Sequence, residues 1–487
     1  MPAIPNFIGS FNRALSPIAD IENTMNMYLE KAESPGAIAP LVLYSIPGFE
    51  NISTASAGFG RAHIFIGMRE FFIFGTSLIE ANHFGVMTVR GTVALDGNPA
   101  TICGNGDAGG ELFITSGGVG YLYTLATDVL TTIALLNPFT SVQATATMGC
   151  SMDGYFIWLD AVHGFVFFSG LNDGTTWDPT QYIQRSQAPD PWVAIGVSNK
   201  YLYLLGDQTG EVWYNAGTFP IPFVPASAGL FNYGCVAPFS LHVVGSYLVW
   251  VGQTANGSGA VLRITGLRPE EISTDALRIE FASYQSLADG IGDSHDVGGH
   301  SFYTVTFPSA NRTWAFDMTT PSWCGRGFWN STIFSYDAWR PGFHAFAFGE
   351  DRFLDLKGAG LYRMRNDLAT DLDGNGIRWE RTAPAMVNQN LMMYYGTLEV
   401  IAQTGIGSST GQGADPQMMM RQSNDGGRTW GVEAWRSMGK IGQYDKTIMW
   451  NRGGRARKRT YQIAGSDPVR VMIAGASVGI EASTEAA

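Results

Sequence analysis

Residues 423–430 (SNDGGRTW) have the types and spacing of an Asp-box, S-x-D-x-G-x-T-W. In this motif the aspartate accepts hydrogen bonds from turn amides and the tryptophan packs beneath the turn, so we interpret the segment as a structural lock on a hairpin. The alternative is catalysis, because a carboxylate can work with a second one to hydrolyse a glycosidic bond. The structural interpretation gives a role to Ser423, Asp425, Gly427, Thr429 and Trp430.

A shortened relative, residues 172–177 (NDGTTW), is one residue out of register with the box. Asp-boxes occur in sialidases, whose chemistry also needs three substrate-clamping arginines and a tyrosine–glutamate pair. No spacing in this sequence indicates those groups. A glycan-active protein, sialidase-like or lectin-like, is therefore the alternative function and not the favoured one.

Residues 104–109 (GNGDAG) match the dinucleotide-binding pattern G-x-G-x-x-G. The residues that follow (GELFITS) predict a strand, whereas a dinucleotide site needs a helix that begins at the glycines. We expect no cofactor here.

Residues 371–376 (DLDGNG) begin like a calcium loop, with Asp371, Asp373 and Asn375 at the first three ligand positions. The bidentate acid should stand at the twelfth position, which is Thr382. We expect a polar loop between strands, with calcium as the alternative.

The dense basic run is residues 452–459 (RGGRARKR). Alternation along a strand predicts Arg455, Arg457 and Arg459 on one face and Lys458 on the other. With Arg452 these residues are candidates for a protein interface, and the alternative is a solvated strand edge whose charge discourages edge pairing. We favour an acidic protein surface over DNA as the partner, because copies of a chain of net charge −12 repel unless positive patches lie at their contacts.

A repeated hairpin must position these segments: an aromatic-rich strand, a tight polar or glycine turn, and a second strand. The clearest copy is residues 200–215 (KYLYLLGDQTGEVWYN), and six echoes begin near residues 62, 110, 154, 245, 299 and 350. Consecutive starts lie about 44 to 54 residues apart, which is the period of a four-stranded propeller blade. We predict an all-β fold with a β-propeller of six or seven blades, closed by an early strand that pairs with a late one.

The repeat also divides the chain. Residues 1–55 lack it and are predicted to form an N-terminal arm, and residues 56–380 form the propeller. Residues 381–475 are predicted to be a C-terminal β-domain with a Gly/Ser loop at 404–413, and residues 476–487 a flexible tail.

Composition agrees with a turn-dense β-protein: the 487 residues include 60 glycines, 13% are aromatic and only 15% are charged. The net charge of −12 argues against a general nucleic-acid binder. We expect no secretory signal in the opening MPAIPNFIGSFNR and no membrane span, which would need about 18 consecutive apolar residues. The scattered cysteines are expected to be small buried hydrophobes of a chain made in a reducing cytosol: Cys103, Cys150, Cys235 and Cys324. The alternative is an occasional disulfide, whose pairing the sequence cannot assign.

Segments along nearly the whole chain resemble, in order, the packaged-DNA stabilisation proteins of short-tailed bacteriophages, also called tail hub or nozzle proteins. The N-terminal ones are MNMYLEKAE (25–33) and LYSIPGF (43–49). The central ones are DGYFIWL (153–159), LNDGTTWD (171–178), LLGDQTGEVWYNAG (204–217), YGCVAPFS (233–240) and GHSFYTVTFPSANRTWAFD (299–317). The C-terminal ones are GQGADPQMMMRQSNDGGRTW (411–430), WRSMGKIGQY (435–444) and SDPVRV (466–471).

The resemblance implies a structural, non-enzymatic virion subunit that forms a homohexameric ring at the distal end of the tail, below the portal and adaptor. There it would retain packaged DNA, support the tail plug or needle, neighbour the receptor-binding fibres or spikes, and take part in genome ejection. The resemblance also implies that DNA passes through the lumen without specific binding, and that the protein is made in the cytoplasm of the bacterial host. A host-type propeller scaffold is a third hypothesis, but WD and kelch signatures do not recur at the blade period.

Overall fold

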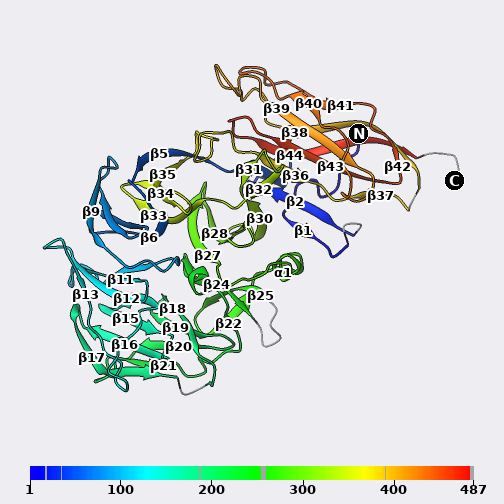
Figure 1. Cartoon of the computed structure of the whole chain (residues 1–487). Coiled ribbons are helices and arrows are strands. Elements are labelled where there is room, and N and C mark those ends of the chain that lie inside the picture. Colours follow the sequence, from blue (N-terminus) through cyan, green and yellow to red (C-terminus); the bar gives the residue numbers. More distant parts are fainter. Residues whose placement is uncertain (17–18, 35, 186–187, 254–258, 390, 483–487) are drawn as a thin grey trace.

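The computed structural model describes residues 1–16, 19–34, 36–185, 188–253, 259–389 and 391–482. Within these ranges the regular secondary structure is strands, together with one α-helix, α1 (Asp275–Ala282), and one 3-10 helix, η1 (Pro238–Ser240), and turns and loops connect these elements. Figure 1 shows a ring of blades beside a β-sandwich that contains the C-terminal strands. The predicted all-β class is confirmed.

The propeller has seven blades: six are separate sheets, and the remaining one, blade 6, consists of the first four strands of an 11-stranded sheet that continues into the sandwich. Blade 1 contains β6 (Gly60–Ile66), β7 (Arg69–Phe74), β8 (Ser77–Ala81) and β9 (Met87–Thr92), and blade 2 contains β10 (Thr101–Gly104), β11 (Glu111–Ser116), β12 (Val119–Thr124) and β13 (Val129–Thr132). Blade 3 contains β14 (Met148–Met152), β15 (Tyr155–Asp160), β16 (Phe165–Gly170) and β17 (Asp173–Gln184), and blade 4 contains β18 (Trp192–Ser198), β19 (Tyr201–Gly206), β20 (Gly210–Asn215) and β21 (Phe223–Pro225).

Blade 5 contains β22 (Gly234–Cys235), β23 (His242–Val244), β24 (Tyr247–Gln253), β25 (Gly259–Thr265) and β26 (Arg268–Glu271). Blade 6 contains β27 (Ile291–Val297), β28 (His300–Phe307), β29 (Arg312–Asp317) and β30 (Ser322–Arg326), and a hairpin of β31 (Phe328–Asn330) and β32 (Ser335–Asp337) follows it. Blade 7 contains β33 (Pro341–Ala347), β34 (Glu350–Asp355), β35 (Gly360–Arg365) and the early strand β5 (Gly48–Thr54).

The blade hairpins follow from local sequence and from packing. The turn between β14 and β15 takes positive φ, which Asp153 (50°) and Gly154 (84°) supply. Residues 202–205 of β19 are fully buried, because neighbouring blades cover both faces of the strand. The sequence of such a strand is therefore a continuous apolar run and not an alternation.

The ring closes between blade 7 and blade 1. β5 pairs antiparallel with β35, and β33 packs against β6. Across this seam Arg352 Nη1 lies 2.7 Å from Glu70 Oε2, and His63 Nδ1 lies 2.7 Å from Phe343 O. The predicted closure by an early strand is confirmed, and the described residues form seven blades.

Strands from both ends of the chain form the sandwich. The N-terminal strands are β1 (Asn12–Arg13), β2 (Ile21–Met25), β3 (Met27–Lys31) and β4 (Leu41–Ser45). The C-terminal strands are β36 (Trp379–Thr382), β37 (Met386–Val387), β38 (Met393–Ala402), β39 (Gln417–Ser423), β40 (Ala434–Ser437), β41 (Ile448–Trp450), β42 (Gly454–Ala456), β43 (Lys458–Gly465) and β44 (Met472–Ala482). One sheet has the order β3-β4-β44-β38-β41, and the other contains β2-β36-β43-β39-β40. Side chains of both sheets share one core, which includes Met27, Leu43, Met418, Ile463 and Ile473.

The structure distributes the predicted arm 1–55 among three places. β3 and β4 belong to a sheet of the sandwich, β2 links the other sheet to blade 6, and β5 completes blade 7. In the predicted tail, β44 extends to Ala482, and residues 483–487 lie outside the described residues.

Candidate functional site at the propeller–sandwich junction

The side chain of Asn26 connects the propeller to the sandwich through hydrogen bonds. It follows β2, which runs parallel to β30 of blade 6 and antiparallel to β36 of the sandwich. Asn26 is 1% exposed and has a φ of 55°, a conformation that asparagine tolerates better than most residues. Its Nδ2 donates to Gly327 O (2.7 Å) and to Arg378 O (2.8 Å), and its Oδ1 accepts from the Gly327 amide (3.0 Å). One buried side chain therefore joins the exit of blade 6 to the start of the sandwich.

Arg381 of β36 holds the first residues of the chain. Its side chain is fully buried. Nε donates to Phe7 O (2.7 Å), Nη1 to Ser10 O (3.0 Å), and Nη2 to Asn6 O (3.0 Å) and to the carboxylate of Glu22. Burial raises the pKa of Glu22, while the guanidinium of Arg381 acts in the opposite direction. The guanidinium of Arg381 therefore fixes the N-terminal segment by binding three of its backbone carbonyls.

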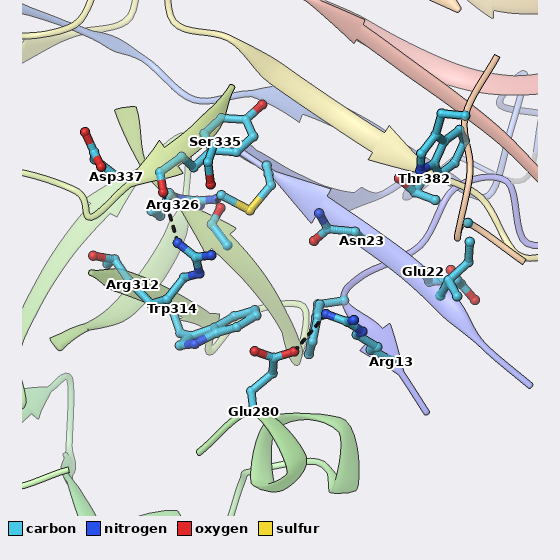
Figure 2. A pocket seen from close by; sticks show the side chains of 18 of the residues that line it. Arg13, Glu22, Asn23, Glu280, Arg312, Trp314, Arg326, Ser335, Asp337 and Thr382 are labelled. Carbon is cyan, nitrogen blue, oxygen red and sulfur yellow. Dashed lines mark hydrogen bonds and ion pairs between the residues drawn. The ribbon is translucent and has the colours of Figure 1, made fainter. Parts of the chain in front are cut away.

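A pocket of about 300 Å³ lies beside this junction (Figure 2). Blade 6, the hairpin β31–β32, helix α1, the strands β1 and β2, and the loop after β39 contribute to its walls. Phe11 and Trp314 pack together at 4.4 Å between ring centroids on one side, and Tyr336 and Trp430 supply further aromatic surface. The pocket therefore spans the boundary between the propeller and the sandwich.

Charged groups of both signs line this junction pocket, and the acidic ones are already engaged. Figure 2 shows Arg13 directed at Glu280, with Nη1 3.4 Å from Oε1. Asp337 accepts hydrogen bonds from Asn311 and Asn330, which lower its pKa. Arg312 donates only to backbone carbonyls of the described residues, Asn311 O (3.1 Å) and Tyr336 O (3.0 Å).

The Asp-box forms the connection between β39 and β40, beside this pocket. Asp425 Oδ1 accepts hydrogen bonds from the amides of Arg428 and Thr429 (both 3.0 Å) and from Ser423 Oγ (2.7 Å). Its Oδ2 accepts from Thr429 Oγ1 (2.6 Å), and these bonds hold its pKa far below the usual range. Trp430 is half-buried, with the guanidinium of Arg421 5.1 Å from its ring. In this geometry the carboxylate orders a turn.

Two of the other motifs lie in turns or links between strands. In residues 172–177, Asp173 accepts from Thr175 N (2.9 Å) and Thr176 Oγ1 (2.6 Å), and Trp177 Nε1 donates to Gly174 O (2.7 Å). The glycine-rich residues 104–109 lie at the link from β10 to β11, so a strand follows them, as predicted.

The candidate calcium loop uses its carboxylates within the chain. Asp371 Oδ1 accepts from the amides of Asp373 and Asn375 (both 2.9 Å), and burial raises the pKa of Asp371. Asp373 Oδ2 lies 2.7 Å from Arg340 Nη1. Across the described ranges, no group of three or more His, Cys, Asp or Glu side chains is arranged to hold a metal ion.

The basic run does not form one continuous strand, so the prediction that Arg455, Arg457 and Arg459 share a face is wrong. β42 ends at Ala456 and β43 begins at Lys458, and this break changes the alternation. Arg459 is 1% exposed and donates to Asn424 Oδ1 (2.8 Å), Gly453 O (2.7 Å) and Gln422 Oε1, between the rings of Tyr395 and Tyr461. Arg459 is therefore a core residue and not an interface residue. Arg452, Arg455 and Arg457 are exposed, and Lys458 is half-buried.

All four cysteines are free thiols. Cys235 and Cys324 are buried, and Cys103 and Cys150 are half-buried. Burial raises the pKa of Cys103 and of Cys235 to about 12, which makes these two thiols poor nucleophiles. In the part of the chain that the structure describes, no helix could span a membrane.

Sequence reasoning missed Asn26, Arg381 and the junction pocket. A single asparagine or arginine has no spacing pattern, and its partners lie hundreds of residues away. The available signal was indirect: Asn26 lies within residues 25–33, one of the segments that carry the family resemblance.

The architecture defines a class of protein, a seven-bladed propeller joined to a β-sandwich through N-terminal strands, in which the candidate motifs stabilise the fold. The sequence matches the family described as "Bacteriophage P22 Gp10, beta-propeller" over residues 22–368 and "Bacteriophage P22 Gp10, beta-sandwich" over residues 378–481. The chain belongs to the bacteriophage P22 Gp10 family of packaged-DNA stabilisation proteins and is a virion component. The resemblance seen in the sequence is confirmed.

Solved structures with a similar chain path include the N-terminal domain of Nup159, at 10% identity and a TM-score of 0.41, covering 70% of this chain and 98% of that one. A catalytically inactive virginiamycin B lyase from Staphylococcus aureus with quinupristin has 11% identity and a TM-score of 0.41, covering 65% and 97%. At these values neither likeness supports a statement about function. No curated protein matches the sequence.

Proposed function

We propose that the chain is a tail hub, or nozzle, subunit. Six copies form a ring at the distal end of the tail, where they retain packaged DNA and support the plug or needle and the receptor-binding fibres or spikes until genome ejection. The observation that carries this proposal is the match of both parts of the chain, in order, to one phage family. The proposal includes synthesis in the host cytoplasm and no enzymatic activity.

The junction supports the proposal that the propeller and the sandwich form one rigid subunit. β2 is hydrogen-bonded to a propeller strand and to a sandwich strand, and the buried side chains of Asn26 and Arg381 bind backbone groups on both sides of it. Domains that meet through a small polar interface usually move relative to one another. A strand that both domains share prevents this relative motion. A subunit that must keep its position in a ring needs such a fixed arrangement.

We further propose that Arg452, Arg455 and Arg457 contact an acidic surface of a neighbouring protein. All three are exposed at one end of the sandwich, and copies of a chain of charge −12 need positive patches at their contacts. A row of arginines along the lumen would instead hold DNA, since each phosphate contact adds salt-dependent affinity.

Two measurements test the ring. Light scattering of the isolated chain at micromolar concentration should show mostly monomer, because a ring that closed early would miss its template in the tail. A density map of assembled tails should show six copies at the distal end. A stable hexamer of the isolated chain would contradict the first expectation, and a map without such a ring would contradict the proposed function.

A second candidate function is glycan binding, which the junction pocket favours because aromatic rings, arginines and carboxylates converge there. Calorimetry with a panel of sialosides and neutral sugars, and an assay for sialoside turnover, test it. Binding or turnover that Arg312→Ala removes, in a chain that stays folded, would favour this function over the structural one.

A further inference from the structure

Arg326, the last residue of β30, is a buried arginine without an acidic partner. It is 3% exposed, and of its five N–H groups the described contacts engage only those of Nη1, which donates to Met27 O (2.8 Å) and weakly to Gly325 O (3.5 Å). Its guanidinium carbon lies 5.3 Å from the centre of the Phe302 ring. Arg326 also lines the junction pocket. Because no carboxylate contacts this buried charge, an anion beside it would stabilise the folded chain.

The other buried arginines of the described ranges show how this protein compensates such charges. Four have a carboxylate oxygen at 3.9 Å or less: Arg61, Arg352, Arg378 and Arg381. Arg459 instead donates to two amide oxygens and one carbonyl, between two tyrosine rings. Arg326 has neither arrangement. The nearby Asp317 is engaged by His300 Nδ1 (2.7 Å) and by two backbone amides.

A small cavity lies beside Arg326. Its volume is about 10 Å³, roughly the space that one water-sized sphere needs. His295 of β27 lines the same cavity, is 6% exposed, and has an Nδ1 that makes no hydrogen bond. Burial lowers the pKa of His295, so its imidazole is neutral and one nitrogen carries a donor hydrogen. The remaining walls are aromatic or aliphatic: Tyr28, Ile46, Pro47, Val297, Phe302, Trp339 and Met364.

We propose that this cavity binds one small monovalent anion of the size of chloride or bromide, held by the guanidinium of Arg326 and the Nδ1–H of His295. The positive charge of Arg326 repels a cation. A water molecule would satisfy hydrogen bonds but would leave the charge uncompensated, whereas a halide does both. Because the walls come from the N-terminal strands, blade 6 and blade 7, the ion would stabilise the place where these three parts meet.

The first test is unfolding by urea in sodium chloride, sodium bromide and sodium gluconate at equal ionic strength. Gluconate is too large for the cavity. Above the dissociation constant, the folding equilibrium constant should rise tenfold for each tenfold increase in chloride or bromide, and gluconate should not have this effect. The dependence should vanish in Arg326→Met and persist in the control Arg459→Met, which also removes a buried arginine and therefore corrects for general salt effects.

The second test uses the wild-type chain and remains decisive even if Arg326→Met does not fold. Crystals soaked in bromide should give an anomalous peak between Arg326 and His295. A water molecule at that place without an anomalous peak would overturn the proposal. So would equal stability in chloride and gluconate, or a halide dependence that Arg326→Met retains.

Discussion

Replacing Arg381 by methionine should release the N-terminal residues from the junction and destabilise the whole chain. The variant keeps most of the aliphatic volume but removes the donors to the carbonyls of Asn6, Phe7 and Ser10 and the partner of the Glu22 carboxylate. Each buried acceptor left unpaired costs about 1–3 kcal/mol, and removing one partner of a buried ion pair costs about 3–5 kcal/mol. Glu22 is 13% exposed and can recruit water, so we expect a loss of about 3–5 kcal/mol in the free energy of unfolding rather than the sum.

The assay is urea unfolding followed by tryptophan fluorescence, together with limited proteolysis of the folded chain. Cleavage should move into the first 25 residues of Arg381→Met. Arg455→Met is the matched control, because it removes an exposed arginine of the same sandwich. The double variant Arg381→Met, Glu22→Gln should lose less stability than the two single changes added together, since it leaves no uncompensated carboxylate. A loss below about 1 kcal/mol, with the N-terminus still protected, would refute the role assigned to Arg381.

Three further predictions concern pH, the Asp-box and assembly. Burial raises the pKa of Glu380 above 4.5, so the protonated side chain stabilises the folded state. This contribution to the free energy of unfolding is fully present below pH 4.5 and is lost as the pH rises through the folded pKa. Glu380→Gln should remove this loss of stability with rising pH, and an unchanged pH dependence in the variant would contradict the prediction. Trp430→Ala should lower the free energy of unfolding by less than the typical loss for a fully buried tryptophan, which is about 3–5 kcal/mol. Asp425→Ala should speed hydrogen exchange at the amides of Arg428 and Thr429. If these amides stay protected in Asp425→Ala, another group orders the turn. Changing Arg455 and Arg457 to glutamate should block incorporation into tails while the monomer keeps its unfolding midpoint; normal assembly of leaky particles, with steep salt-dependent DNA binding by the wild type, would assign the segment to DNA retention instead.

The propeller could be predicted because its causes are local. Each blade repeats an apolar run that both faces bury and a turn such as Asp153–Gly154 that needs positive φ, and both features are visible within about twenty residues of sequence. The Asp-box turn was predictable for the same reason. The interpretation of the basic run was wrong for Arg459, because it assumed one continuous strand and the strand breaks at Arg457.

The junction could not be predicted because its causes are long-range. Nothing in residues 1–55 indicates that β2, β3 and β5 will enter three different sheets, since period-2 alternation does not specify a partner. The partners of Asn26 and Arg381 are mostly backbone atoms, which every residue offers equally. The cavity beside Arg326 is lined by residues from three separate parts of the chain, so only the three-dimensional packing reveals it.

The pairing of first strands with last ones has a consequence for synthesis. β5 leaves the ribosome early but must wait for residues 360–365, and β4 must wait for β44 at residues 472–482. Domains usually fold in order as they emerge, whereas here the earliest strands are the last to find their partners. For most of translation the nascent chain therefore carries unpaired strand edges, which are sites for association with other chains. A product that terminates before residue 360 would lack β44 and β35, the late partners of β4 and β5, so it could complete neither the ring nor the sandwich.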